Sequence, residues 1–515
     1  MDKSMLTKEE SSQITLTKFD IAAACEGGGE YTMPDYYPAI RKIVSCTAQA
    51  LPDTKFLSGD TLEHGGTLAF TVLYIGEDGA LVALPYTCEY SGSQQLPSEV
   101  RGTAEIAVDA KAEDIQCRVL APRKISLRAR IKARISAFEK ASCQLDMSTV
   151  DGGDISMAER ATVQTLCHSI STMRCGRGNA TGTVSGEVRE KMGAKPVSCS
   201  AAVNITEVKC QRDSITVRGE AVVRCIVFTK DGSYAPSRAR LPFEEHVTAD
   251  GCAEGDMCRA WGRAASVSVS EGDDGALKAE IEYDLDAEWC RKIEATITDD
   301  AYSTGWHSNI ERTDIAALSP LCCTFSSLSL SGNGKRTTRP EAGEYLIDMT
   351  CDASIEKSEQ KDSHMIFSGS CTVKAYIASN GEVICEEFSL PLRFEAAAAS
   401  PASSGDIITR ASICCTDING RLEGDTVSTN IELCLSLSCR REQMIHPASK
   451  IMLDQSAPTT KDAAQIKVFY PADNETIWDI SKKYQAPVAR IEKINALPRT
   501  QNANGKAILI PVGLG

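Results

Sequence analysis

The chain has 515 residues, of which 42% are hydrophobic and 24% charged, a composition typical of soluble globular domains. Its net charge of −15 disfavours nonspecific binding to nucleic acid or anionic lipid, because basic surface supplies most of that attraction. The first 17 residues contain no apolar segment, and no window approaches 18 consecutive apolar residues. We therefore expect no secretory signal, no transmembrane segment and a cytoplasmic protein.

The 22 cysteines are many for a chain without an export signal. No Cys-x-x-Cys motif occurs, and the adjacent cysteines at 322–323 and 414–415 would point to opposite faces of a strand, a poor geometry for zinc. We expect no metal and no cofactor, and we predict that most cysteines are small buried thiols kept reduced. An oxidised, cross-linked assembly is the alternative.

Residues 1–17 are polar and charged, which predicts a flexible arm. The segment Met-Pro-Asp-Tyr-Tyr-Pro follows at residues 33–38. Each proline disfavours helix in the residue before it, so we predict extended chain and turns here.

A long internal repeat begins at residues 66, 219 and 369, so its period is about 150 residues. Each copy is an apolar, β-rich run that ends in Asp-Gly or Asn-Gly, namely at Gly79, Gly232 and Gly381. These dipeptides adopt positive φ at low cost and close β-hairpins. Each copy then returns to apolar sequence, which predicts the second strand of a hairpin.

The second half of the repeat is also β-rich. Residues 125–135 alternate between apolar and mostly cationic side chains, which predicts a half-buried antiparallel strand. The later copies have strand patterns at 264–270 and 277–285 around Gly275, and at 411–414 and 427–435 around Gly424. We predict a mainly β fold with three antiparallel domains arranged as a rod-like array. Their limits are 18–150, 163–303 and 316–455, and each is long enough for its own core.

A linker at 456–465 precedes a small module at 466–512, for which we predict a βααβ order. Val468 and Tyr470 share one side of its first strand, and Asp473 or Asn474 caps the next helix. Ile477, Ile480 and Tyr484 form the apolar stripe of this helix. A second helix starts at Pro487, contains Val488, Ile491 and Ile494 on its apolar face, and stops at Asn495. A turn at Gly505 then leads to a strand at 507–510.

This module resembles the LysM domain, a small βααβ fold that usually binds N-acetylglucosamine-containing glycans. Residues 33–38, together with Ala-Pro-Arg-Lys at 121–124, resemble signature segments of the SPOCS domain. The combination is similar to clostridial spore-coat morphogenetic proteins of the SipL type, which join SPOCS repeats to one C-terminal LysM domain. The resemblance covers almost the whole chain.

The resemblance implies a groove between the loop after the first strand and the loop before the last. By position, the binding residues are Asp473, Asn474, Glu475, Thr476, Ile477, Trp478, Asn495, Leu497, Pro498 and Arg499. The Gly-Asp-Thr usual in LysM domains is replaced by Asn474, Glu475 and Thr476, which favours a protein ligand over a glycan. For Trp478, core packing and ligand contact are both open. The module carries a net charge of +3, which suits an acidic protein partner.

The function that the resemblance implies is a non-enzymatic spore-coat scaffold in the mother-cell cytoplasm. Its module would bind the coat's basement-layer ATPase, another coat protein or an N-acetylglucosamine-containing glycan at the forespore surface. The alternative is a peptidoglycan-binding cell-envelope protein. An enzyme hidden in a repeat is a third hypothesis, although the six histidines are scattered and neither H-E-x-x-H nor G-x-S-x-G occurs.

Overall fold

The computed structural model describes residues 13–96, 104–142, 145–149, 155–188, 194–272, 276–361, 364–397, 406–459, 466–502 and 506–511. It is mainly β, with several antiparallel sheets and a few short helices, so the expected fold class is confirmed at this level. The helices within these ranges are α1 (Met157–Arg160), α2 (Ile477–Lys483) and α3 (Val488–Asn495).

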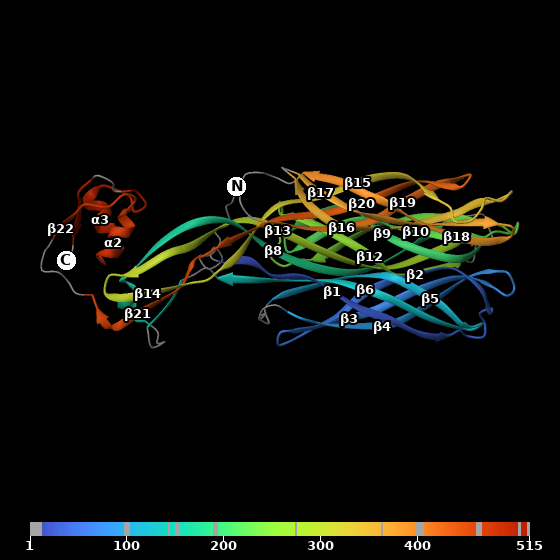
Figure 1. Cartoon of the computed structure of the whole chain (residues 1–515), viewed down its shortest axis with the longest axis horizontal. Helices are drawn as coiled ribbons and strands as arrows, with labels where there is room; N and C mark the ends of the chain where they lie inside the picture. Colours follow the sequence, from blue (N-terminus) through green and yellow to red (C-terminus); the bar gives the residue numbers. More distant parts are fainter. Residues whose placement is uncertain are drawn as a thin grey trace.

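Three successive stretches of chain fold into the same arrangement of six strands, here called units 1, 2 and 3 (Figure 1). Unit 1 contains β1 (Gln13–Thr32), β2 (Ile40–Ser58), β3 (Thr61–Gly76), β4 (Leu81–Gln95), β5 (Glu105–Ala121) and β6 (Lys124–Ser142). Unit 2 contains β8 (Val163–Val188), β9 (Lys195–Gln211), β10 (Ser214–Phe228), β11 (Tyr234–Thr248), β12 (Met257–Glu271) and β13 (Leu277–Ser303). Unit 3 contains β15 (Ile315–Lys335), β16 (Tyr345–Lys361), β17 (His364–Ser379), β18 (Glu382–Ala397), β19 (Asp406–Glu423) and β20 (Thr426–Ile445).

Each unit consists of two three-stranded layers. The second, third and fourth strands form one antiparallel meander, while the sixth strand pairs with both the fifth and the first in the other layer. The sequence places the two halves of each repeat in these two layers. The first-half hairpin is the third and fourth strands, and the second-half hairpin is the fifth and sixth.

The core of each unit lies between its layers, because alternate side chains of a strand point to the same face. In β6 the alternating pattern at 125–135 is confirmed: the apolar residues are buried and the cationic ones exposed. Ile125 and Leu127 pack in one cluster with Phe70 and Tyr74 of the opposite layer. Full burial of one such side chain contributes about 1.5–3 kcal/mol, so these faces hold the layers together.

The predicted hairpin turns are confirmed at the Asp-Gly and Asn-Gly dipeptides. Gly79, Gly232 and Gly381 have φ values of 81°, 81° and 80°, each between the third and fourth strands of its unit. Gly424, with φ of 60°, joins β19 to β20 as expected. The turn expected at Gly275 lies outside the described residues.

The glycine that begins each repeat has a common structural role. Gly66, Gly219 and Gly369 lie at register shifts between the second and third strands of their units. A Cβ atom at any of the three would collide with a backbone carbonyl oxygen of the neighbouring strand. The repeat therefore keeps a residue without a side chain where two backbones approach closely at a bulge.

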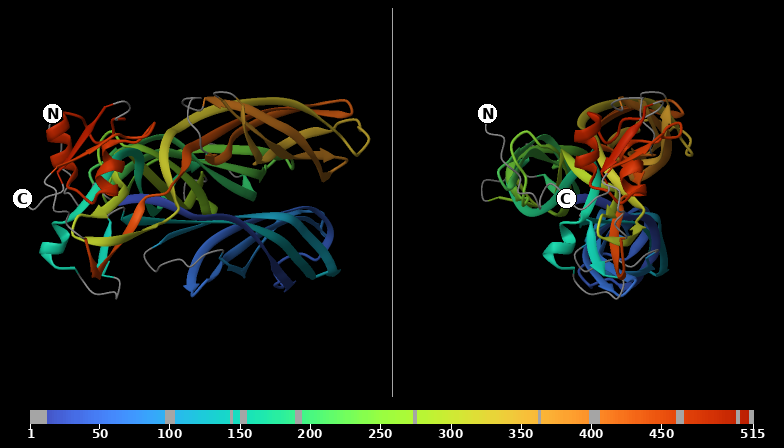
Figure 2. Two further views of the ribbon diagram at one scale, coloured as in Figure 1. Left: turned by 60° about the vertical axis from the view of Figure 1, so that its left-hand side comes forward. Right: turned by 90° about the vertical axis from the view of Figure 1, so that its left-hand side faces the viewer.

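The three units lie side by side, with their strands running roughly along the long axis of the molecule (Figures 1 and 2). Leu16 of β1 pairs with Ala317 of β15, so one layer of unit 1 and one layer of unit 3 form a single six-stranded sheet. The molecule is thus a bundle of units rather than the expected rod-like array. That each range, 18–150, 163–303 and 316–455, folds as an independent domain stays a prediction.

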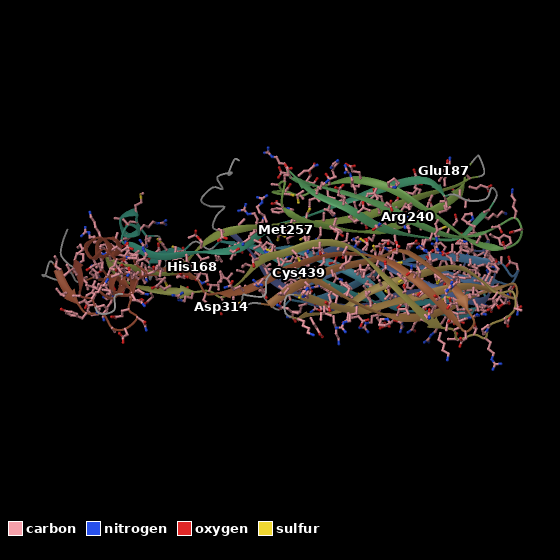
Figure 3. All side chains as sticks on the ribbon, turned by 90° about the horizontal axis from the view of Figure 1, so that it is seen from above. His168, Glu187, Arg240, Met257, Asp314 and Cys439 are labelled. Atoms are coloured by element: carbon pink, nitrogen blue, oxygen red, sulfur yellow. The ribbon has the colours of Figure 1, made fainter. Side chains whose placement is uncertain are left out.

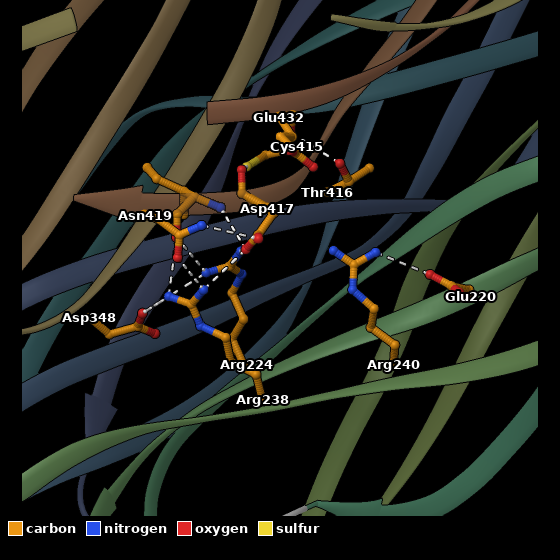
Figure 4. A network of polar contacts seen from close by, with 11 residues as sticks. Glu220, Arg224, Arg238, Arg240, Asp348, Cys415, Thr416, Asp417, Asn419 and Glu432 are labelled. Atoms are coloured by element: carbon orange, nitrogen blue, oxygen red, sulfur yellow. Dashed lines mark hydrogen bonds and ion pairs between the residues drawn. The ribbon is translucent and has the colours of Figure 1, made fainter. Parts of the chain in front are cut away.

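Units 2 and 3 are joined by ion pairs between facing strands (Figure 4). Arg224 Nη2 lies 2.6 Å from Asp417 Oδ1, and Arg238 Nη2 lies 2.9 Å from Asp348 Oδ1. Arg238 also donates to Asn419 Oδ1 at 2.9 Å. Asp348 is buried, so these bonds occur where water competes weakly and they fix the register between the units.

Beyond the units, the chain narrows to a segment that we call the neck (Figure 1). It comprises residues 163–168 of β8, residues 297–303 of β13 and a small sheet in the order β14-β21-β7. The strands of this sheet are β14 (Trp306–Arg312), β21 (Ala448–Pro458) and β7 (Asp146–Thr149). Figure 3 labels His168 and Asp314 along it, between the units and the far end of the molecule.

The terminal module occupies that far end and consists of β22 (Ile466–Phe469), α2, α3 and β23 (Ile508–Pro511). The two strands pair antiparallel, so the βααβ order follows the predicted one. β21 continues to Pro458, within the expected linker at 456–465, and residues 460–465 lie outside the described ranges. Likewise β1 begins at Gln13, within the expected arm at 1–17.

Candidate functional site

The first loop of the module is shaped by the start of α2. Thr476, not Asp473 or Asn474, is the N-cap: its hydroxyl accepts from the Asp479 amide, and the Asp479 carboxylate accepts from the Thr476 amide. The prediction of the cap was wrong because the helix begins two or three residues later than expected. The reciprocal pair then satisfies two free amides. Asn474 has φ of 71°, the left-handed conformation that asparagine tolerates.

The second loop is shaped by the end of α3. Asn495 is its last residue, and Ala496 follows in the left-handed conformation. The Asn495 side chain accepts from the Leu509 amide and donates to the Leu509 carbonyl, both at 2.8 Å. It therefore ties α3 to β23, and its role in the described structure is to support the fold. Ile494, expected on the buried face, is exposed, whereas Val488 and Ile491 are buried as predicted.

The structure brings the two predicted loops together. The Ile477 amide donates to the Gln501 carbonyl at 3.3 Å, and the Trp478 amide donates to the Arg499 carbonyl at 2.9 Å. Thr476 also forms an isolated bridge with Asn502. The two segments that the resemblance placed on either side of a groove are thus direct neighbours. The predicted turn residue Gly505 lies outside the described residues.

The predicted site residues differ in exposure. Asp473, Asn474 and Pro498 are exposed, and Glu475, Thr476, Leu497 and Arg499 are half-buried. Ile477 and Trp478 are buried, with 3% of Trp478 exposed. Ile477 and Trp478 are therefore closed to solvent in this conformation, whereas the edges of the predicted site are accessible.

The residue that covers Trp478 is Tyr302, which belongs to the neck. The two ring centroids lie 5.0 Å apart in an edge-on arrangement, and the Tyr302 hydroxyl donates to the Ala486 carbonyl at 2.7 Å. Burial raises the pKa of Tyr302 above its usual value, so it remains a neutral donor. Trp478 packs in the core that the module shares with the neck, in line with the core-packing alternative.

Asp300 adds a polar clamp beside this aromatic pair. Its carboxylate accepts from Trp478 Nε1 and from Lys482 Nζ, each at 2.8 Å. Arg499 completes the contact from the second loop, because its Nη1 donates to the Thr165 carbonyl at 3.4 Å. The sequence offered no signal for Asp300 or Tyr302, since both lie more than 160 residues before the module.

A second surface of the module is open. Ile466, Val468 and Tyr470 are 54%, 58% and 75% exposed, and Leu509 stands directly opposite Val468 in the strand pair. We call these four residues the apolar strip. The prediction that Val468 and Tyr470 share one side of the strand holds, and that side faces away from the module core. Four exposed apolar side chains on so small a module are typical of a contact surface.

The other candidate region is the junction of the three units. A cavity of about 960 Å³ lies there, lined by strands of all three units. Beside it, Glu288 of β13 is 2% exposed and lies 2.6 Å from Arg259 Nε, 2.9 Å from Arg440 Nη2 and 3.4 Å from Arg177 Nη2. Burial opposes ionisation of Glu288, but the arginines outweigh it and hold its pKa well below the usual value.

Phe138 of unit 1 completes the junction. Arg410, Arg440 and Arg177 lie over its ring at 4.7, 5.1 and 5.4 Å from the centroid, so an aromatic side chain from one unit receives cations from the other two. Burial, with repulsion from Arg177, lowers the pKa of Arg410 to about 9. The arrangement carries excess positive charge in a buried site and fixes the units relative to one another.

The described residues offer neither a metal centre nor a membrane-spanning helix. No group of three or more His, Cys, Asp and Glu side chains in these ranges is placed to hold a metal ion. None of the helices that the structure describes has the length and apolar character of a bilayer-spanning segment. Comparison with protein-family models, curated proteins and solved structures finds no match to this chain.

Proposed function

We propose that this chain is a non-enzymatic scaffold of a spore coat, in which the terminal module is a LysM domain and units 1–3 are SPOCS-type domains. The βααβ order of the module and the threefold repetition of one six-strand unit support this. So does the resemblance of residues 33–38 and 121–124 to SPOCS signature segments. The protein then acts in the mother-cell cytoplasm at the forespore surface.

The observation that carries the proposal is the apolar strip. The loops expected to bind a glycan pack against the neck through Trp478, whereas Val468, Tyr470 and Leu509 face solvent. Apolar side chains that are exposed in the free chain and buried on binding supply most of the affinity of protein contacts. The positive module charge favours an acidic partner and faster association with it. The ligand is accordingly a protein, namely the basement-layer ATPase of the coat or another coat protein.

The test is a binding measurement with the full chain and the purified basement-layer ATPase. We expect Val468→Asp to weaken binding at least about tenfold, because it places a charge in the centre of the contact. The matched control is Phe56→Asp in unit 1, which replaces another well-exposed apolar residue of a β-strand and should leave binding unchanged.

The same preparation is titrated with chitooligosaccharides to separate the two ligand classes. Tight binding of the sugar, without binding of the ATPase or another purified coat protein, would contradict the proposal. That result would favour the peptidoglycan-binding envelope protein instead. Equal loss of ATPase binding in the Val468 and Phe56 variants would show that the apolar strip is not the contact.

A further inference from the structure

The cavity at the junction of the three units differs in charge from the rest of the chain. Its lining contains six lysine and arginine residues and four aspartate and glutamate residues, whereas the whole chain has a net charge of −15. Its volume of about 960 Å³ is in the range of cavities that hold small molecules. Strands of all three units line it, so the cavity exists only in the assembled bundle.

Unit 3 contributes the outer face of its sheet to this cavity. Ser412 of β19, Ser436 of β20 and Phe325 of β15 are register partners across the three strands, so their side chains point to the same side. That side faces away from the core of unit 3, because the neighbouring residue Leu435 packs in that core. Arg410 precedes Ser412 by two residues in β19, and its side chain therefore projects from the same face toward the cavity.

Two of these side chains carry polar atoms without a hydrogen bond. The hydroxyl of Ser436 and the Nε and Nη2 atoms of Arg410 are buried and form no hydrogen bond within the described part of the chain. The two residues are only 4% and 5% exposed, respectively. A buried polar group without a partner is costly, and folded proteins contain few of them. Both groups can donate, so the partner that fits them is an acceptor.

The charge of Arg410 is also only partly balanced. In the described structure its one ion pair is with Asp20, whose Oδ2 lies 3.8 Å from Arg410 Nη2 and accepts from Arg134 Nη2 at 2.7 Å. Burial, together with repulsion from Arg177, lowers the pKa of Arg410 to about 9. An anionic acceptor beside Arg410 would complete its hydrogen bonds and balance its charge at the same time.

Most other cations of the lining already have a carboxylate partner. These pairs are Arg134 with Asp20, Arg259 with Glu288, Arg263 with Asp284 and Lys111 with Asp352. Lys132 forms no ion pair with any residue that the structure describes, and it adds a second unbalanced charge to the wall of the cavity. The excess positive charge of the lining is therefore located at Arg410 and Lys132.

We propose that this cavity is a binding site for a small oxyanion, a carboxylate or a phosphate, which accepts hydrogen bonds from Arg410 and Ser436. This inference does not depend on the proposed function. Ser412 stands beside Ser436 in the strand pair and supplies a further donor. Trp261 of unit 2 and Phe325 of unit 3 also line the cavity, whose volume leaves room for a carbon skeleton attached to the anionic group.

The test is a calorimetric titration of the full chain with citrate and, separately, with inorganic phosphate. Sodium chloride at the same ionic strength is the reference, because it reproduces the general effect of salt. We expect one site per chain for at least one of the two anions, and the tighter of the two identifies the group that the site prefers. Arg410→Met should weaken this binding at least about tenfold, because hydrogen bonds from a charged donor are lost.

A second measurement separates binding from a structural role of the arginine. In sodium chloride, Arg410→Met should leave the Tm unchanged or raise it, because it removes an incompletely balanced buried charge. The matched control is Arg421→Met, an exposed arginine of the same strand, which should keep the full affinity for the anion. A lower Tm of Arg410→Met combined with unchanged affinity would show that Arg410 serves the fold alone, and it would overturn the proposal.

The serine provides an independent arm of the test. Ser436→Ala should weaken binding of the same anion about three- to tenfold, because one neutral donor is lost. The matched control is Ser237→Ala, which changes another buried hydroxyl without a hydrogen bond among the described residues, but outside the lining of the cavity. It should leave the affinity unchanged. Binding of neither anion beyond the chloride reference, or equal weakening in the Arg410 and Arg421 variants, would also overturn the proposal.

Discussion

The junction of the three units and the contact between the neck and the terminal module use opposite means to hold parts of one chain together. At the junction, Glu288 is buried among arginines from two units, and the Phe138 ring of the third unit lies under three guanidinium groups. At the neck, one aromatic pair and one carboxylate, Tyr302 with Trp478 and Asp300, form the centre of the contact.

The difference shows which parts of the molecule can move. Separation of the units would have to divide the six-stranded sheet shared by units 1 and 3 and, at the same time, break the ion pairs of Glu288, Asp348 and Asp417 across the units. Release of the module exposes mainly one tyrosine and part of one tryptophan, and the charged groups it frees can be solvated by water. The bundle of units is therefore a fixed body, and the module is the part whose attachment can be altered.

The largest expected effect is at the junction. Glu288→Gln removes the only carboxylate that contacts Arg259, Arg440 and Arg177 together in the described structure. We expect a loss of about 3–5 kcal/mol in the free energy of unfolding, measured by urea denaturation, because the arginines remain buried without their counter-charge. Glu280→Gln, an exposed position on the same strand, is the control and should change it little.

The ionisation of Glu288 also predicts how the free energy of unfolding depends on pH. The pKa of Glu288 is held below its usual 4.5, so its contribution is fully present above pH 4.5 and is lost as the pH falls through the lower folded pKa. Below about pH 4.5 the Glu288→Gln variant should therefore lose less stability on acidification than the unchanged chain. A constant difference between the two chains down to acid unfolding would contradict the role assigned to this carboxylate.

An intermediate effect is expected at the neck. Tyr302→Ala removes the ring that covers Trp478. Truncation of such a buried aromatic typically costs about 3–5 kcal/mol of stability. Here part of that loss weakens the docking of the module, and part destabilises the core of the neck. We expect faster amide hydrogen exchange in α2 and a longer maximum dimension in solution scattering. Tyr302→Phe removes only the hydroxyl that donates to Ala486, so it should cost about 1 kcal/mol and keep the module docked.

The outcome at Tyr302 decides whether the two regions differ as described. If Tyr302→Ala left both hydrogen exchange and scattering unchanged, the module would be held as firmly as the units are. If it also accelerated exchange throughout unit 2, the neck and the unit would form a single cooperative structure. Either result would remove the distinction between a fixed bundle and a releasable module.

The smallest effect is expected inside the module. Thr476→Ala removes the N-cap of α2 and should destabilise this helix by about 1 kcal/mol, seen as faster exchange of its first amides. Asp473→Ala changes an exposed residue of the same loop and should have little effect. The opposite ranking of the two variants would restore the cap position that the sequence suggested.

Local sequence was sufficient for the strands and their turns. Gly79, Gly232 and Gly381 marked the hairpins because Asp-Gly and Asn-Gly specify a turn without reference to the rest of the chain. The alternation from Ile125 to Ile135 marked a buried face for the same reason. The βααβ order of the module likewise followed from short-range patterns of apolar residues.

The site and the packing of the units required contacts that no local pattern contains. Trp478 is covered by Tyr302, which lies far away in the sequence, so the closure of the predicted groove could not be foreseen. Glu288 belongs to a strand whose sequence alternates like any other, and nothing nearby indicates the arginines of unit 3. The start of α2 at Thr476 was missed because Asp473, Asn474 and Thr476 are all residue types that can act as a cap.

The small sheet in the neck depends on strands that follow all three units. Its strands β7, β14 and β21 follow units 1, 2 and 3 respectively, and β21 lies between the other two. The sheet therefore forms only when three distant parts of the chain have each folded and met. The residues that hold the module stand beside it, so a truncated or misassembled chain would display its terminal module differently from a finished one.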